Sequence, residues 1–138
     1  MKPLPYPLRA VPALFAALLL ALLAACSSSN TPEATVETLL FAAAKGDVEK
    51  TAEQFSMAGV PDADLMQAKG KVQIMVGEMQ KAAQAHGGLK SVEIVKSETS
   101  SDGKSAKVQA KLKYGDGKDG NERFTLVQDG GRWKVSFK

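Results

Sequence analysis

The sequence is poor in the residues that build most metal and disulfide sites, with one cysteine and one histidine in 138 residues. A lone cysteine cannot form an internal disulfide. A soft metal site needs several nitrogen or sulfur ligands, which one cysteine and one histidine do not supply. We therefore expect no metal site and no cofactor. No internal repeat or long low-complexity tract is visible.

Charge is also nearly balanced. The formal net charge of +3 includes Lys2 and Arg9, and without these two residues it falls to +1. A generic nucleic-acid-binding protein carries a clear excess of basic residues. We therefore expect no nucleic-acid partner.

Residues 1–25 have the three parts of a secretory signal. Lys2 and Arg9 give a positive start, an apolar run follows over residues 10–23, and small residues end the segment. The run is shorter than the ~20 residues that a spanning helix needs, and Pro12 interrupts its beginning. The pattern predicts a removable signal rather than a transmembrane helix.

The residues Leu23, Ala24, Ala25 and Cys26 resemble the lipobox of bacterial lipoproteins. This resemblance implies that the Cys26 thiol becomes diacylglycerylated, that residues 1–25 are removed, and that the new amine is acylated, with palmitate as an expected chain. Acyl chains contribute about 0.8 kcal/mol per buried CH₂, so two or more hold a protein stably on a membrane. The alternative is a secreted protein with an incidental cysteine.

Ser27 follows the cysteine. In the sorting rule of Gram-negative lipoproteins an Asp at this position retains the protein in the inner membrane, so the resemblance implies the outer membrane, facing the periplasm. Residues 26–30 are then the lipidated Cys and a polar tether, which averages roughly 12 Å in reach. Residues 31–138 remain for a single domain.

Helical patterns fill the first half of this domain. Thr31 and Pro32 mark a helix start, apolar residues recur at helical spacing through Ala43, and Gly46 marks the end. Asp47 can cap a short second helix. A third pattern runs over about residues 62–86, with two internal glycines that mark a bend or the close approach of another element.

From Leu89 the period changes to two. Alternating residues predict four strands, around 92–94, 106–114, 124–126 and 133–137, with a tight hairpin at 129–131. Helices followed by an antiparallel meander predict an α+β domain whose helices cover one face of the sheet. We expect a core that includes Leu39, Phe55, Val76, Met79, Trp133 and Phe137.

Three features together resemble a known group: this element order, the start at residues 31–33, and the segment 124–135 (FTLVQDGGRWKV). The group consists of small bacterial lipoproteins of unknown function in the nuclear-transport-factor-2-like (NTF2-like, cystatin-like) superfamily, and the resemblance covers about residues 31–138. It implies N-terminal helices packed on a curved four-stranded antiparallel sheet, which forms a cone around a long helix.

Few residues are candidates for catalysis. His86 could act as the base of an NTF2-like enzyme of the hydratase or isomerase type, or simply end a helix where the dipole is negative. The loop 114–120 carries two carboxylates but lacks EF-hand spacing, so we interpret it as a polar hairpin loop. Asp62 and Asp64 are interpreted as acids at a helix start. We identify no catalytic residue.

The distribution of charge predicts a basic sheet face. Residues 31–64 carry a formal charge of −5 and residues 65–138 carry +6. Bases alternate with apolar residues on the strands, so we expect contact with an anionic surface through Lys107, Lys111, Lys113, Arg132 and Lys134. An ordinary solvated face is the alternative. Like charges on this face argue for a monomer.

The sequence thus predicts a lipid-anchored envelope protein whose domain binds a small ligand or an envelope protein without catalysis. An enzyme that uses His86 and a purely structural or assembly lipoprotein are the alternatives.

Overall fold

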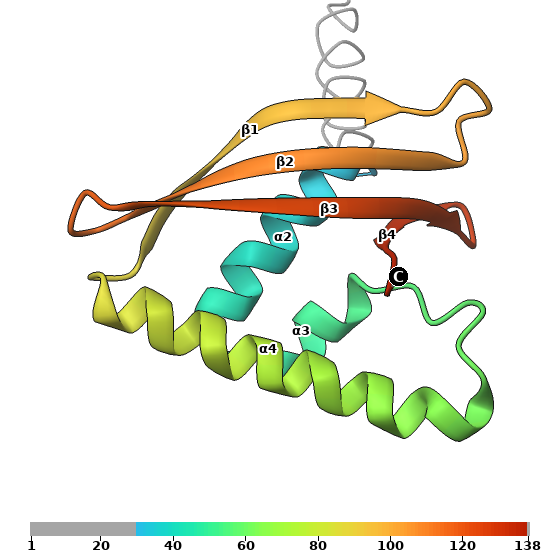
Figure 1. Cartoon of the computed structure of the whole chain (residues 1–138), viewed down its shortest axis with the longest axis horizontal. Helices are drawn as coiled ribbons and strands as arrows, with labels where there is room; N and C mark the ends of the chain where they lie inside the picture. The colour runs from blue at the N-terminus through green and yellow to red at the C-terminus, as the bar shows by residue number, and fades with distance from the viewer. Residues whose placement is uncertain (1–29, 138) are drawn as a thin grey trace, which may run out of the picture.

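A computed structural model describes residues 30–137; residues 1–29 and 138, which include the expected signal and Cys26, lie outside the described part. Helices come first and strands follow (Figure 1). The elements are α2 (Pro32–Ala44), α3 (Val48–Glu53), the 3-10 helix η1 (Asp62–Asp64), α4 (Leu65–Ala85), β1 (Leu89–Thr99), β2 (Ser105–Tyr114), β3 (Asp119–Asp129) and β4 (Arg132–Val135). This order confirms the expected α+β fold.

The helix ends lie where the sequence predicts them. The Thr31 hydroxyl accepts a hydrogen bond from Ala34 N at 3.1 Å, and Asp47 Oδ1 accepts one from Lys50 N at 3.0 Å. Gly46 follows the C-cap of α2 with a φ of +80°, a conformation that glycine adopts without a Cβ penalty. Capping side chains and glycines therefore define α2 and α3 before any tertiary contact is considered.

The four strands form an antiparallel meander in the order β1-β2-β3-β4. Register shifts interrupt the pairing of β1 with β2 between Leu89 and Ser91 and between Ile94 and Lys96. Such irregularities bend and twist a strand, and the sheet is curved in Figure 1. β4 is shorter than expected, because Ser136 and Phe137 lie beyond it.

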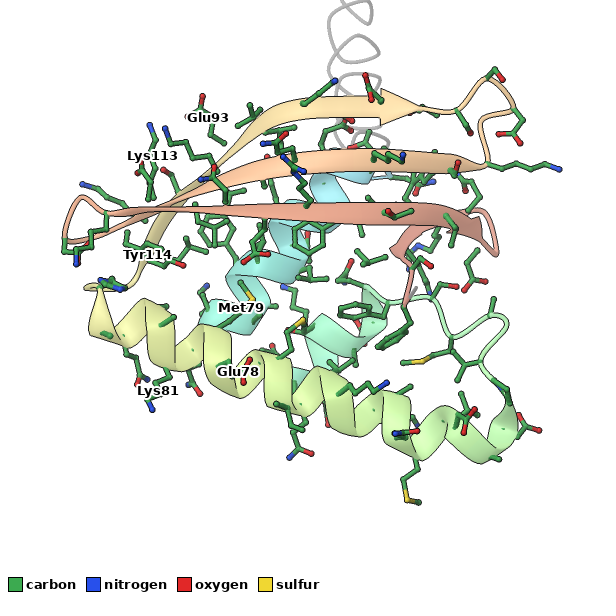
Figure 2. All side chains as sticks on the ribbon, viewed as in Figure 1. Glu78, Met79, Lys81, Glu93, Lys113 and Tyr114 are labelled. Atoms are coloured by element: carbon green, nitrogen blue, oxygen red, sulfur yellow. The ribbon has the colours of Figure 1, made fainter. Side chains whose placement is uncertain are left out.

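The helices cover one face of this sheet. α2 packs against β1, β2 and β4, and α4 packs on α2 and α3 on the side away from the sheet (Figure 1). Figure 2 shows Met79 pointing from α4 towards the sheet and Lys81 pointing away. The core joins all of these elements, with Val36, Leu39, Leu40, Val72, Val76, Val108, Leu112 and Leu126 among its buried side chains.

The expected core is correct for Leu39, Phe55 and Val76, which are all buried. Met79, Trp133 and Phe137 were expected to be largely buried, but they are only partly buried and pack against the outside of the core cluster. Trp133 and Phe137 lie on β4 or just beyond it, and β4 is one of the two edge strands of the sheet. On its outer side β4 has only an isolated bridge from Val135 to Phe55, so the large side chains at this edge are less completely covered.

The two glycines inside α4 have no partner element in the described part of the chain. A methyl group added at Gly70 or Gly77 would meet no described atom of another element within 4 Å. α4 also continues through both positions. The close approach, one of the two interpretations of these glycines, is therefore absent within residues 30–137. No helix of this region is long and apolar enough to cross a membrane.

Candidate functional site

The face of the sheet that the helices leave open carries most of its polar side chains. Along β2 the even-numbered residues from Ala106 to Leu112 are buried against the helices. Successive side chains of a strand point to opposite faces. The odd-numbered residues from Lys107 to Lys113 therefore project from the open face.

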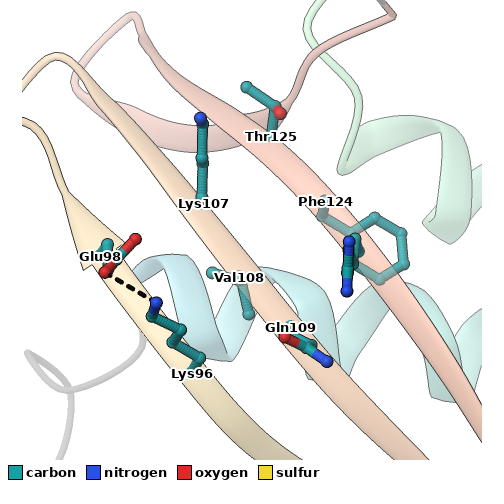
Figure 3. Close-up of a pocket in the computed structure, with 8 residues that line it drawn as sticks. Lys96, Glu98, Lys107, Val108, Gln109, Phe124 and Thr125 are labelled. Atoms are coloured by element: carbon teal, nitrogen blue, oxygen red, sulfur yellow. Dashed lines mark ion pairs between the residues drawn. The ribbon is translucent and has the colours of Figure 1, made fainter.

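Strand register brings further polar residues beside them. Gln109 lies opposite Arg123 of β3 and Lys96 of β1, while Lys107 lies opposite Thr125 and Glu98. These side chains border a groove of about 340 Å³, which Figure 3 shows with the helices behind the strands. The residues that line it are Lys96, Glu98, Lys107, Val108, Gln109, Arg123, Phe124 and Thr125.

The groove has a net positive lining. Lys96 Nζ and Glu98 Oε1 form an ion pair at 3.1 Å, so these two side chains neutralise each other. Lys107 and Arg123 form no ion pair with any residue of 30–137. Both side chains are exposed. The arrangement offers two cations, an amide and a hydroxyl to a ligand that lies across the strands.

The remaining lysines of β2 are paired. Lys111 Nζ lies 3.2 Å from Asp119 Oδ2, and Lys113 Nζ lies 3.4 Å from Glu93 Oε2. Figure 2 shows Glu93 and Lys113 together on the open face. The sequence interpretation, in which the acids concentrate in the first two helices, missed these partners because β1 and β3 supply them.

Arg132 and Lys134 lie at the opposite end of the sheet. Asn30 binds on both sides of Arg132, since its Nδ2 donates to Gly131 O at 2.9 Å and its Oδ1 accepts from Trp133 N at 3.2 Å. Neither Arg132 nor Lys134 has an ion-pair partner within the described residues. The first described residue of the domain is thus fixed next to two free cations.

A second polar cluster lies where α4 ends. His86 Nδ1 and Asp116 Oδ2 are 2.7 Å apart, and the rings of His86 and Tyr114 have their centroids 5.4 Å apart. An ionised carboxylate only accepts hydrogen bonds, so Nδ1 carries the proton. Burial, followed by the charge of Glu122, raises the pKa of Tyr114.

The backbone around this cluster joins the β2–β3 hairpin to the end of α4. Gly115 N donates to Gly88 O and Asp116 N donates to His86 O, both at 2.9 Å. A Cβ at Gly115 would lie within 3 Å of the Gly87 carbonyl, so only glycine fits there. His86 therefore caps the end of α4, as the structural alternative anticipated. It also anchors the hairpin, which the sequence did not indicate.

We expect acid to release this hairpin tip. The backbone N–H of Lys118, and after it the His86 side chain, hold the pKa of Asp116 below its usual value. A group with a lowered folded-state pKa stabilises the fold above its unfolded pKa and loses this effect as pH falls through the folded value. Amide-exchange protection of Gly115 and Asp116, measured by NMR, should be constant above about pH 4 and decrease below it.

The control for this expectation is Asp116→Asn, which removes the titrating carboxyl. Its hairpin protection should be weaker at neutral pH and should show no loss in the acid range. Equal acid sensitivity in both proteins would show that another group controls the hairpin.

A further depression of about 590 Å³ lies between the segment 56–64 and the end of β3. Phe137 borders it and stacks on Phe55 with a centroid distance of 4.7 Å. Ser56 at its edge is buried, and its hydroxyl donates to Asp129 Oδ2 at 2.8 Å. These contacts join the α3–α4 connection to the sheet, and we interpret the depression as the rim of the core.

Sequence reasoning missed most of the groove. Of the five expected contact residues only Lys107 lines it. The signal that could have found Arg123 is the hairpin itself, because a turn centred on residues 115–118 pairs Lys113 with Asp119 and therefore Gln109 with Arg123. Asp62 and Asp64 begin and end η1 and are exposed.

Comparison with known proteins gives a family and a fold. The family model described as "Domain of unknown function (DUF4878)" matches residues 24–136. No curated protein matches significantly.

Among solved structures, a Campylobacter jejuni protein described as an NTF2-like transpeptidase aligns with a TM-score of 0.72 and 18% identity, over 78% of this chain and 99% of its own. A SEC-C-motif-containing protein from Rhodopseudomonas palustris aligns with a TM-score of 0.50 and 19% identity, over 83% of this chain and 82% of its own. At such identities the likeness establishes the NTF2-like fold and no activity.

Proposed function

Because the chain belongs to the family described as Domain of unknown function (DUF4878) and has an NTF2-like fold, we propose that it is a lipid-anchored protein of the cell envelope whose domain binds a ligand or partner without catalysis. The lipid is attached at Cys26. Ser27 at the next position favours the outer membrane, facing the periplasm.

The observation that carries the proposal is how soon the folded domain follows the cysteine. Asn30 is already hydrogen-bonded to the β3–β4 turn, and only three residues separate it from Cys26. A chain extends at most about 3.6 Å per residue, so the anchor lies within about 14 Å of Asn30. The family match also begins at residue 24, which leaves the apolar segment outside the shared region.

This short link gives the domain a membrane-facing end. In the strand register, Arg132 lies opposite Asp129 at one end of β3. Lys113 lies opposite Asp119 at the other end. Ten residues at about 3.3 Å each separate these ends by roughly 30 Å. Arg132 and Lys134 therefore lie within reach of the head groups, while Lys111 and Lys113 lie far from them and are already ion-paired.

We predict that the double substitution Arg132→Gln/Lys134→Gln weakens binding to anionic vesicles by about 30-fold at low salt. A basic residue near an anionic surface contributes about 1 kcal/mol, and a 1.4 kcal/mol loss is tenfold in affinity. The measurement is co-sedimentation of a protein that begins at Ser27 with vesicles rich in phosphatidylglycerol. The core cluster formed by the described residues 30–137 lies wholly within this protein.

Lys111→Gln/Lys113→Gln is the matched control, since it removes the same charge from the distant end of the sheet. It should lose much less binding, and 0.15 M salt should weaken binding generally because the Debye length falls to about 8 Å. Wild-type protein that does not sediment with vesicles at low salt would remove the membrane-contact part of the proposal. Equal losses in both double variants would contradict the proposed orientation, in which the Arg132 end of the sheet faces the membrane.

The His86–Asp116 pair supports an enzymatic alternative. A histidine oriented by a carboxylate leaves Nε2 free as a general base. However, neither residue lines the groove, and both are used to hold the hairpin on α4. We therefore retain binding as the proposed function and treat the pair as structural.

We also propose a monomer. Packing the open sheet faces of two copies together would bring Lys107 and Arg123 of each copy into one desolvated interface. Unpaired like charges are costly in such a place.

A further inference from the structure

Two cations in the groove are left without partners, although the same sheet pairs other lysines. Lys107 has no ion pair in the described chain despite Glu98 opposite it, because Glu98 is held by Lys96 at 3.1 Å. Arg123 likewise has none. Lys111 and Lys113 lie further along the same strand, and both have acidic ion-pair partners. Among the described residues, Lys107 is therefore the one lysine of β2 without an ion-pair partner.

The two cations are close enough to act on one group. Lys107 lies opposite Thr125, and Arg123 lies opposite Gln109, so the two cations are diagonal neighbours on adjacent strands. Such positions are about 7–8 Å apart at the backbone, within reach of long side chains. Two like charges this close repel, and an anion between them would remove that repulsion.

The side chains suit an oxyanion. Arginine binds a carboxylate or phosphate through two parallel N–H donors, and lysine adds a point charge. The Gln109 amide and the Thr125 hydroxyl add neutral donors on the same face. The volume of about 340 Å³ lies at the lower end of the range for small-molecule sites.

We propose that this groove binds a phosphate or carboxylate group of a small polar molecule or of a lipid head group, with Arg123 as the bidentate donor and Lys107 as the second cation. The inference rests on the proposed binding function and names its ligand class. Lys96 and Glu98 neutralise each other on the β1 side, so the two unpaired cations place the anion towards β3. Phe124 and Val108 lie beneath the polar layer.

The test is an NMR titration of the protein that begins at Ser27 with glycerol phosphate and, separately, with acetate. We expect saturable shifts at the amides of residues 96–98, 107–109 and 123–125. Arg123→Gln should weaken binding at least tenfold, because hydrogen bonds to charged groups are the strong ones. Lys107→Gln should weaken it less, and Lys111→Gln should stay within about twofold of wild type. Arg123, Lys107 and Lys111 are not buried, so these variants should keep the fold.

A second arm distinguishes the sources of the anion. If a lipid head group is the ligand, phosphatidylglycerol vesicles will perturb the same amides and glycerol phosphate will compete with them. If the ligand is soluble, the vesicles will leave these amides unchanged. No saturable binding of either probe, or an equal loss in Lys111→Gln and Arg123→Gln, would overturn the proposal. Processing at Cys26 is measured independently, so failure of the groove would not be confused with failure of the anchor.

Discussion

Cys26→Ser abolishes lipid attachment and leaves the protein either as an uncleaved precursor or away from the membrane. This is the largest effect that we expect from any single substitution. The thioether to the lipid requires the sulfur of Cys26, the only cysteine of the chain. Without acyl chains, the remaining membrane attraction comes from a few basic residues at about 1 kcal/mol each.

Fractionation of cells that express the variant measures this directly. Ser28→Ala is the matched control, because it changes a polar residue two positions after Cys26 and keeps the thiol. The control should be processed and membrane-bound like the wild type. A Cys26→Ser protein that is processed and still fractionates with membranes would refute the lipoprotein interpretation.

The second large effect concerns the core. Leu39→Ala should reduce the free energy of unfolding by about 2–5 kcal/mol, because Leu39 is fully buried between α2 and the rest of the core. This is much of the stability of a small domain. Trp133→Ala should cost less than the 3–5 kcal/mol expected of a fully buried tryptophan, since Trp133 is only partly buried.

Urea unfolding of the protein that begins at Ser27 compares the two variants. Ile74→Ala is the control, because the Ile74 side chain is 65% exposed on α4 and its truncation should change stability by at most about 0.5 kcal/mol. A larger loss for Trp133→Ala than for Leu39→Ala would show that the edge of the sheet, rather than α2, is the centre of the core.

The fold was predictable because its signals are local. Thr31 and Asp47 act as caps and Gly46 follows a helix end, and each effect is confined to one turn. Alternation along β2 similarly distinguishes the covered face from the open face. These features depend on neighbours in sequence, so a single sequence contains them.

The site was harder to predict because its contacts join distant residues. His86 and Asp116 are 30 residues apart, and their contact depends on how the β2–β3 hairpin docks on α4. The ion pair of Lys113 with Glu93 likewise depends on the irregular register of β1, which alternation does not reveal. The isolated bridge of Phe55 to Val135 is another contact that no local pattern indicates.

The most direct test of the central claim is the intact mass of the mature protein extracted from membranes, followed by fragmentation of its N-terminal peptide. The account predicts a chain that begins at Cys26, lacks residues 1–25, and carries a diacylglyceryl group on sulfur and an acyl chain on its amine. A mature protein that begins elsewhere, or that begins at an unmodified Cys26, would contradict it.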